Sequence, residues 1–446
     1  MNKKIKLQPV QIFAIGFALI ILIGGFLLST PLCSRNGEWI PYVNGVFTST
    51  SATCVTGLVV YDTWTQFNFF GQLVIILLIQ IGGLGFMGVA MTFSFAAKKK
   101  ITIFQRTVLM ESIGVQHVGG VVKAIKRMLF GTLIIEGVGA ILLAIRFVPM
   151  FGVGQGIWYG IFHSISAFCN AGFDLMGQKS PGSSLTLVAD DPVILTTIMV
   201  LITTGGIGFI VWSDICDNRL NFKKYALHTK IMVTFTIGLI LFGAVLFLML
   251  ENNAVFAGMT PGEKVLNAFF ASVTPRTAGF NSIDYMDMTR AGRMLTMFLM
   301  AIGAGTGSTG GGLKVTTFVT LILALYSQAK SYNDLSIFRR RLQKNARRDA
   351  MSSLSSYMAL IIVCVFLLLI ANPSVTLESC TFEAISALST VGLTMGISGS
   401  AGAFSKICLM VLMYCGRLGS IAVAMAFVRR KVIPDLSYPE ESITIG

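Results

Sequence analysis

The sequence predicts an all-α membrane protein of eight transmembrane helices and four re-entrant loops, arranged as four repeats around one axis. Three observations support this fold class. Only 12% of the 446 residues are charged and 54% are hydrophobic, whereas about a quarter of a soluble chain is charged. The mean hydropathy is +0.77, and apolar runs of about 20 residues match about 30 Å of hydrocarbon. A loop motif also recurs four times between these runs.

Eight apolar segments approach or exceed the length that a helix needs to cross a bilayer. They lie at about 11–32, 68–95, 128–149, 192–213, 229–250, 293–329, 353–371 and 403–428. The first segment is too long for the apolar region of a signal peptide and lacks a small-residue cleavage site, so we expect it to be a span. Most of the eight cysteines lie within or beside these segments, which does not support a disulfide framework.

A short motif with one glycine in a fixed place follows every odd-numbered segment. The four copies read FTSTSATCVTGL (47–58), FHSISAFCNAGF (162–173), FFASVTPRTAGF (269–280) and FEAISALSTVGL (382–393). The glycines are separated by 115, 107 and 113 residues. A regular period of span, loop and span predicts four similar units. We expect them at 1–97, at 98–218 including a cytoplasmic linker, at 219–329, and at 330–446 including a basic linker and the C-terminus.

Basic residues are distributed unequally between the two sides of this layout. With the N-terminus inside, 24 of the 34 Lys and Arg residues fall on its side of the membrane, and the opposite side carries 7 basic against 11 acidic residues. The positive-inside rule therefore predicts a multi-pass protein with both termini cytoplasmic. The net negative outer side would attract cations. The stretch 329–349 has six arginines and lysines close together, at 339–348, and is dense enough to dock on anionic lipid or on a cytosolic partner.

Each motif must enter and leave the membrane on the outer side, because a span precedes and follows it. Non-helical backbone at membrane depth is tolerated only where it lines water or is buried in protein. Each copy therefore predicts a short pore helix, from near its phenylalanine to about four residues before its glycine, and then an extended strand. Rings of backbone carbonyls can replace the hydration shell of potassium. The alternative is that the motifs are hairpins that pack the spans together, which suits one copy better than four in register.

The candidate ion-coordinating residues are the glycine of each motif and the two residues before it, acting mainly through main-chain carbonyls. They are Val55, Thr56, Gly57, Asn170, Ala171, Gly172, Thr277, Ala278, Gly279, Thr390, Val391 and Gly392. Glycine suits such a strand because it permits positive φ and close backbone approach. Arg276 would repel cations if it faced the axis, so we expect it to point toward an acid or carbonyls behind the strand.

An arginine interrupts a second internal repeat, in the even-numbered segments. The stretches GGLGF at 82–86 and GGIGF at 205–209 correspond to GRLGS at 416–420, so Arg417 lies where two sister segments have glycine. A charge deep in a span costs at least about 2.5–3.5 kcal/mol and usually faces water or the bundle interior. We therefore expect Arg417 to project toward the axis. The alternative is a packing role, paired with Glu136 or with carbonyls.

The sixth segment is too long for one span and contains GAGTGSTGGG at 303–312. Each glycine destabilises a helix interior by roughly 0.8–1 kcal/mol relative to alanine, so we expect the helix to break there at mid-membrane. A nucleotide-binding P-loop is excluded, because Leu313 separates the last glycine from Lys314 and valine follows.

Together with PRTAGFN at 275–281, these features resemble the Trk/Ktr/HKT superfamily of potassium transporters. The length and eight-span layout most resemble the bacterial Ktr membrane subunits of KtrB type, over essentially the whole chain. The resemblance implies four M1-P-M2 units around one pore, with one glycine in each filter strand, and the glycine at position 57 favours potassium over sodium. It also implies that segment 303–314 blocks the pore beneath the filter and gates it with Arg417. The gating candidates in that segment are Gly305, Gly307, Gly310, Gly311, Gly312 and Lys314.

The sequence therefore predicts potassium uptake through a gated pore, driven by the ion gradient and by about 2.3 kcal/mol per charge per 100 mV of membrane potential. A coupled Na⁺/K⁺ or H⁺/K⁺ symporter with alternating access is the alternative. No catalytic constellation predicts an enzyme, and no covalent cofactor or nucleic-acid partner is expected. The resemblance implies a bacterial plasma-membrane homodimer on a cytosolic ring of RCK-type, KtrA-like subunits that bind ATP or ADP, and stimulation by sodium.

Overall fold

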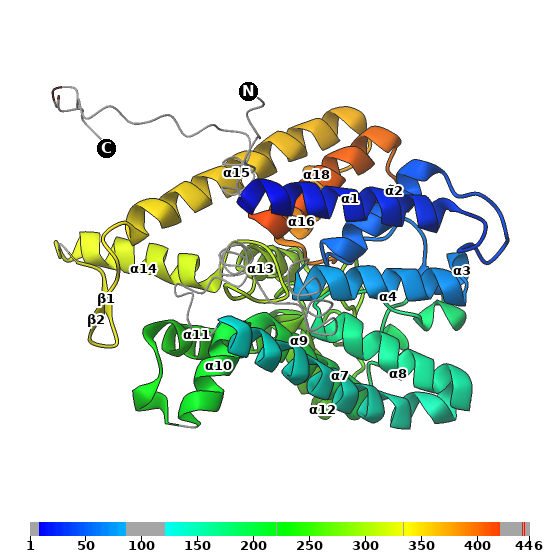
Figure 1. Ribbon diagram of the computed structural model, residues 1–446, viewed down its shortest axis with the longest axis horizontal. Helices are drawn as coiled ribbons and strands as arrows, with labels where there is room; N and C mark the ends of the chain where they lie inside the picture. The colour runs from blue at the N-terminus through cyan, green and yellow to red at the C-terminus, as the bar shows by residue number, and fades with distance from the viewer. Residues whose placement is uncertain are drawn as a thin grey trace, which may run out of the picture.

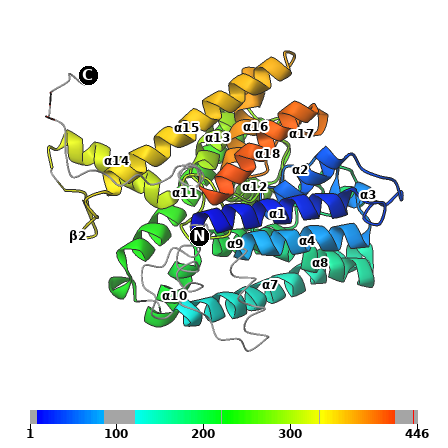
Figure 2. The ribbon, with the colours of Figure 1, turned by 45° about the horizontal axis from the view of Figure 1, so that its top comes forward.

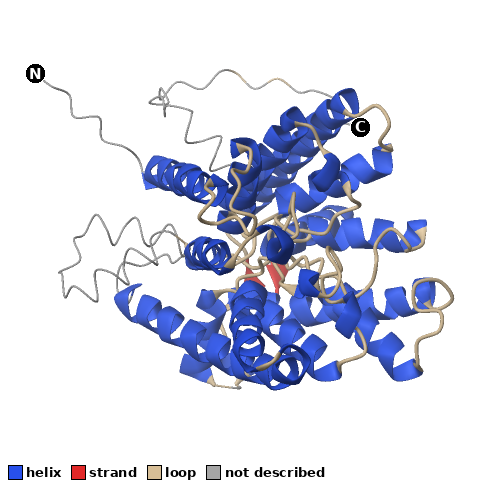
Figure 3. Ribbon diagram, turned by 90° about the vertical axis from the view of Figure 1, so that its right-hand side faces the viewer, coloured by secondary structure: helices blue, strands red, loops and turns tan. Residues whose placement is uncertain are grey.

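A computed structural model of the chain describes residues 9–85, 121–219, 221–332, 334–419, 439 and 441. Nearly all regular structure in these residues is helical, and the helices surround a centre where loops gather (Figures 1 and 3). Each of the four units contributes a long first helix, a shorter helix that we call the loop helix, and a second helix.

The first helices are α1 (Pro9–Ser29), α7 (Val121–Phe151), α11 (Leu227–Glu251) and α15 (Ala346–Ala371). The loop helices are α2 (Tyr42–Thr53), α8 (Val153–Phe168), α12 (Pro261–Val273) and α16 (Leu377–Ser389). The second helices are α4 (Phe69–Leu84), α9 (Pro192–Ile207) with α10 (Phe209–Asn218), α13 (Arg290–Ala301) with α14 (Val315–Ala329), and α18 (Ala403–Leu418). Short helices are α3 (Thr63–Gln66), η1 (Met176–Gln178), η2 (Thr186–Val188), η3 (Phe222–Lys224) and α17 (Ile397–Ser400).

All four first helices contain segments that are long and apolar enough to cross a membrane: Gln11–Ser29, Ile125–Phe151, Leu227–Glu251 and Ala346–Ala371. Many of their large side chains are exposed hydrophobics, such as Ile23, Leu133 and Val363. Apolar side chains on the outside of a bundle indicate that lipid, not water, surrounds it. The chain is therefore an all-α membrane protein that crosses the bilayer several times.

Contacts between units follow a closed cyclic order. The second helix of each unit packs against the loop helix of the next, as α4 does on α8, α9 on α12, and α13 on α16. The ring closes where α18 of the fourth unit packs on α2 of the first (Figure 2). Units that are far apart in sequence thus surround one centre.

A packing contact that recurs in three units fixes each loop helix against its first helix. Serine hydroxyls of the loop helices donate to first-helix carbonyls: Ser49 Oγ to Ile21 O at 2.8 Å, Ser164 Oγ to Glu136 O at 2.7 Å, and Ser272 Oγ to Ile240 O at 2.8 Å. A glycine lies three residues after each acceptor, namely Gly24, Gly139 and Gly243, and a Cβ atom there would collide with the serine and with a second-helix leucine. Small residues thus let the three helices of a unit approach closely.

Local sequence signals start several of these helices. Thr260 and Glu263 form a reciprocal capping box at the start of α12, and Thr376 caps α16. Asp191 accepts from Val193 N and Ile194 N, and Pro192 opens α9. Side-chain acceptors at these positions satisfy main-chain N–H groups that lack a partner within the helix.

The second segments differ from the uninterrupted spans that the sequence suggested. The expected span at 192–213 bends by 94° between α9 and α10, at Gly208, where φ is +101°. The helices α4 and α18 end at equivalent glycines, Gly85 and Gly419, which also have positive φ. A left-handed residue ends a helix, and hydropathy carries no sign of it. The rest of the expected spans, at 86–95 and 420–428, lies outside the described residues.

Of three further expectations, one agrees with the structure and two need correction. The sixth segment does break, since α13 ends at Ala301 and α14 begins at Val315. In all four units the loop helix starts five to nine residues before the motif phenylalanine, earlier than expected, because the preceding residues extend the same helix. The chain is not wholly helical: in the basic linker, β1 (Ser336–Ile337) pairs antiparallel with β2 (Arg340–Arg341), and Phe338 and Arg339 at the turn have positive φ.

The shared packing contact predicts different effects for two glycines of α7. At Gly139 a Cβ atom would lie 2.6 Å from Ser164 Oγ and 2.8 Å from Leu201, whereas nothing lies within 4 Å of one at Gly137. Gly139→Ala should therefore lower the unfolding temperature of the purified protein in detergent, at a cost of about 1–3 kcal/mol. Gly137→Ala, the matched control, should leave it unchanged or raise it, because alanine favours the helix. Equal effects of the two substitutions would contradict this packing.

Candidate functional site

The strands that follow the loop helices share one backbone conformation in all four units. The motif glycines have φ values of +95° at Gly57, +69° at Gly172, +79° at Gly279 and +94° at Gly392. The residues two positions earlier are also left-handed: Val55, Asn170, Thr277 and Thr390 have φ between +52° and +71°. Non-glycine residues rarely adopt this conformation, and strained backbone of this kind clusters at functional sites.

The four glycines meet at the centre in the same cyclic order as the helices. A Cβ atom on Gly57 would lie 2.6 Å from Ala171 O, and one on Gly172 would lie 2.5 Å from Ala278 O. Gly279 stands equally close to Val391 O, and Gly392 to Thr56 O, which closes the circle. Each glycine therefore lies against the carbonyl that precedes the glycine of the next unit. Four equivalent carbonyls, from Thr56, Ala171, Ala278 and Val391, gather around one point.

Hydrogen bonds to the loop helices hold the strands in place from behind. Thr56 N, Ala171 N and Val391 N each donate to a loop-helix carbonyl at 2.8 Å, and Ala278 N donates to Thr274 O, directly after α12, at 3.0 Å. Gly57 N and Gly392 N donate to Ser51 Oγ and Ser386 Oγ. Because these N–H groups are bonded to the helices behind them, the strands have main-chain carbonyls left to face the centre.

Polar side chains lie next to the ring, at the left-handed position. Asn170 Nδ2 donates to Thr277 Oγ1 at 3.0 Å. Gly311 N donates to Thr390 Oγ1 at 3.0 Å. The glycine segment, which we define as residues 303–314, also reaches the other two strands: Thr309 Oγ1 donates to Asn170 Oδ1 at 3.4 Å, and a Cβ atom on Gly310 would collide with Thr277 Oγ1. It therefore contacts the strands of the second, third and fourth units on one side of the ring.

The glycine segment folds back on itself in this position. Gly303 N donates to Leu313 O at 2.8 Å, and residues 302 and 313 form an isolated parallel bridge. Gly305 N donates to Gly206 O at 2.8 Å. Lys314 Nζ donates to Gly310 O at 2.8 Å and contacts Gly311 O at 3.5 Å. The predicted gating residues therefore lie together directly beside the strands, and Gly307 and Gly312 have positive φ there.

Arg417 joins three units beside this segment. Its guanidinium donates to Thr309 O of the glycine segment and to Gly82 O and Gly83 O at the end of α4. The equivalent residues of the other three units are small, namely Gly83, Gly206 and Ala304. Ala304 is assigned because Leu299 precedes Gly303 by the same four residues as Leu412 precedes Gly416. The large side chain of Arg417 therefore fits beside the small residues that the other three units have at this position.

Arg276 and Glu136, two buried ionisable residues, have separate partners. Arg276 points away from the ring, as expected, and donates to Thr236 O and Thr236 Oγ1 on α11 at 3.2 and 3.3 Å; its partners there are a carbonyl and a hydroxyl and not an acid. Glu136 accepts from Gln80 Nε2 at 3.2 Å and lies near the Cys169 thiol. In the described part of the chain, Glu136 has no contact with Arg417, so that suggested pairing is wrong.

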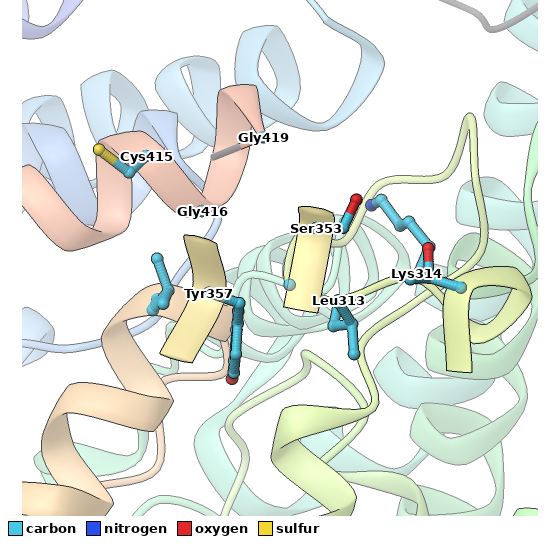
Figure 4. Close-up of a pocket in the computed structure, with 10 residues that line it drawn as sticks. Leu313, Lys314, Ser353, Tyr357, Cys415, Gly416 and Gly419 are labelled. Atoms are coloured by element: carbon cyan, nitrogen blue, oxygen red, sulfur yellow. The ribbon is translucent and has the colours of Figure 1, made fainter. Parts of the chain in front are cut away.

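A small cavity adjoins the glycine segment. Its volume is about 150 Å³, and Leu313, Lys314, Ser353, Tyr357 and Cys415 are among the side chains around it (Figure 4). These residues come from the glycine segment, α15 and α18, so the cavity lies between the third unit and the fourth. Sequence reasoning did not find this cavity, nor the part played by Thr309, because both depend on how the units meet.

An acidic residue stands just outside the ring. Asp174 follows Gly172 by two residues, and its carboxylate accepts from Met176 N at 2.9 Å. Burial, followed by the nearby charge of Asp62, raises the pKa of the Asp174 carboxyl group to about 7, against the opposing effect of hydrogen bonds from Met176 N and the Ser184 side chain. Its charge therefore changes near neutral pH.

A multi-unit membrane bundle with a central ring of carbonyls defines a protein that moves cations. Comparison with known proteins agrees: residues 20–435 match the family model described as TrkH, cation transport protein. The chain belongs to this family of transporters, and it is not an enzyme.

Relatives cover the full length of the chain. The potassium/sodium uptake protein NtpJ of Enterococcus hirae is 40% identical over 100% of this chain and 99% of its own. The Ktr system potassium uptake protein B of Bacillus subtilis is 36% identical over 100% and 98%. The crystal structure of the potassium transporter TrkH from Vibrio parahaemolyticus superposes with a TM-score of 0.76, at 18% identity, over 96% of this chain and 86% of that one.

Gly57→Ser tests the ring. The added side chain would collide with Ala171 O and force serine into φ of +95°, so the ring should distort and the preference for potassium over sodium should fall. Relative uptake of the two ions into proteoliposomes measures it. Gly37→Ser is the control, because Gly37 also has positive φ, at +69°, yet nothing lies within 4 Å of its Cβ position. Unchanged relative uptake in a well-expressed Gly57 variant would remove Gly57 from the filter.

Proposed function

We propose that this protein takes up potassium across the bacterial plasma membrane through a channel-like pore. The observation that carries the proposal is the closed ring of four carbonyls, from Thr56, Ala171, Ala278 and Val391, each lying against the next unit's glycine. Carbonyl oxygens in a ring can replace the water around a dehydrated potassium ion. The main-chain carbonyls of the other predicted filter residues extend this ring along the axis.

The membrane arrangement follows from the same geometry. Each unit is an M1-P-M2 repeat, in which the loop helix enters and leaves the outer half of the bilayer between two spans. The excess of basic residues in the linkers and termini places both termini in the cytoplasm. The ring then faces the outside, where net negative loops and Asp174 raise the local concentration of cations.

The gate is formed by the glycine segment with Arg417 and Lys314. The segment lies across the inner side of the ring and touches three of its strands, at Asn170, Thr277 and Thr390. Arg417 holds it through Thr309 O, and Lys314 holds its fold through Gly310 O. Opening requires the segment to move aside, and the cavity of about 150 Å³ beside Leu313 and Lys314 offers space on that side.

One of the relatives supports a regulatory partner. A relative 36% identical is a membrane protein of a Ktr system, so we propose a homodimer on a cytosolic ring of RCK-type subunits that bind ATP or ADP, with sodium as an activator. The hairpin β1–β2 and the residues after it carry exposed arginines, among them Arg340, Arg341 and Arg348, and are a suitable docking surface for that ring or for anionic lipid.

A coupled symporter is the second candidate. It is favoured by the name of the 40% identical relative, which includes both potassium and sodium. Four units in cyclic order favour a pore, because carriers more often use inverted repeats.

Substitution of Arg417 tests the gate. A fixed charge beside the path opposes potassium by about 4 kcal/mol at 4 Å and an effective dielectric constant of about 20. Arg417→Ala should increase potassium flux and reduce its dependence on the cytosolic subunits. Arg417→Lys should give an intermediate flux, because it keeps the charge but loses the planar set of donors. Misfolding of both variants would instead assign Arg417 a structural role and leave the gate to the glycine segment alone.

Electrical measurement in proteoliposomes separates the pore from the symporter. A pore passes potassium down its own gradient, so the current should reverse near the potassium Nernst potential and should not move when the sodium gradient is inverted. A symporter would give a reversal potential that depends on both gradients. The same measurement with and without a candidate cytosolic subunit tests regulation.

A further inference from the structure

One position of the loop helices, nine residues before the motif glycine, is occupied by a different residue in each unit. It holds Thr48 in α2, His163 in α8, Phe270 in α12 and Glu383 in α16. The side chains of His163 and Glu383 are fully buried. In these two units, and in the same register, the side chain reaches the main-chain N–H three residues after the glycine.

His163 makes this contact through its imidazole ring. Nδ1 lies 2.8 Å from Tyr159 O, one turn earlier on α8, and Leu175 N donates to Nε2 at 3.3 Å. A carbonyl can only accept and an N–H can only donate, so the proton is on Nδ1 and Nε2 is the acceptor. The neutral ring thus ties the strand beyond Gly172 to its loop helix.

Glu383 makes the corresponding contact through its carboxylate, with more donors. It accepts from Met395 N at 3.4 Å, from Ser398 N at 3.1 Å and from the Ser398 hydroxyl. Thr394 Oγ1 donates to both carboxylate oxygens, at 3.0 and 2.9 Å. All of these donors belong to residues 394–398, so one buried carboxylate organises the whole segment beyond Gly392.

The other two units differ at this position. Thr48 Oγ1 donates to Asn44 O within its own helix, and Phe270 has no polar atom. The second and fourth units lie opposite each other in the cyclic order, so the two tied strands face across the ring. The strands of the first and third units lack this tie.

On the basis of the proposed function, we propose that His163 and Glu383 are positioning residues for ion selection. By fixing the strands beyond Gly172 and Gly392, they keep two opposite carbonyls, of Ala171 and Val391, from moving inward around a smaller ion. If these carbonyls could move closer together, they would replace the hydration shell of sodium as well, and the preference for potassium over sodium would fall. The side chains act through the backbone and touch no ion themselves.

The test uses His163→Phe, which keeps a ring but removes the acceptor, and Glu383→Gln, which keeps the shape but replaces one acceptor oxygen with a donor. The ratio of potassium to sodium uptake into proteoliposomes should fall about fivefold in each, the factor that one lost hydrogen bond supplies. Thr48→Val is the matched control and should leave the ratio unchanged, since its hydroxyl bonds only within α2.

A purely structural role would lower the amount and unfolding temperature of the variants without changing the ratio. An unchanged ratio in folded His163→Phe and Glu383→Gln proteins would therefore overturn the proposal. If either variant does not fold, Thr394→Val, which removes one donor to Glu383, decides: its ratio should fall by a smaller factor, and no change would reject the proposal. Absence of potassium uptake by the unsubstituted protein would contradict the proposed function instead.

Discussion

The close approach of four main chains at one point is the constraint on which the rest of the structure depends. At Gly57, Gly172, Gly279 and Gly392 each backbone lies against a carbonyl of the next unit, where no Cβ atom fits. Gly57 N and Gly392 N bond to serine hydroxyls of the loop helices, and the N–H groups of Thr56, Ala171 and Val391 bond to loop-helix carbonyls. The loop helices must therefore be held firmly, and the serine contacts to the first helices and the glycines opposite them provide that support.

The residues that we propose as the gate are those that depart from the four-fold symmetry. Three units have Gly83, Gly206 and Ala304 at a position where the fourth has Arg417, and in the third unit the glycine segment separates the two parts of the second helix. These two departures meet, because the arginine donates to Thr309 O. The proposed gate of main-chain carbonyls and a guanidinium would be displaced without rearranging the ring, since the four strands have their own main-chain hydrogen bonds behind them.

Features that recur along the sequence could be predicted from it, whereas a bend at one residue and a contact between two distant helices could not. Four copies of the glycine motif were enough to predict four units, and the density of glycine at 303–312 was enough to predict the broken helix. The bend at Gly208 was missed, because one glycine in an apolar run has no effect on hydropathy. Of the two partners suggested as the alternative for Arg417, carbonyls are the ones that it contacts and Glu136 is not. A long-range pairing of Glu136 with Arg417 cannot be distinguished from one with Gln80 on α4 without coordinates.

The central claim is that the four carbonyls of Thr56, Ala171, Ala278 and Val391 bind potassium. The most direct measurement is anomalous diffraction from crystals of this protein grown with thallium or rubidium, which replace potassium. If the four carbonyls bind potassium, an anomalous peak should lie on the axis, equidistant from the four carbonyl oxygens, and should be lost when sodium replaces these ions. No peak there, with ions held instead by side chains of the outer loops, would contradict it.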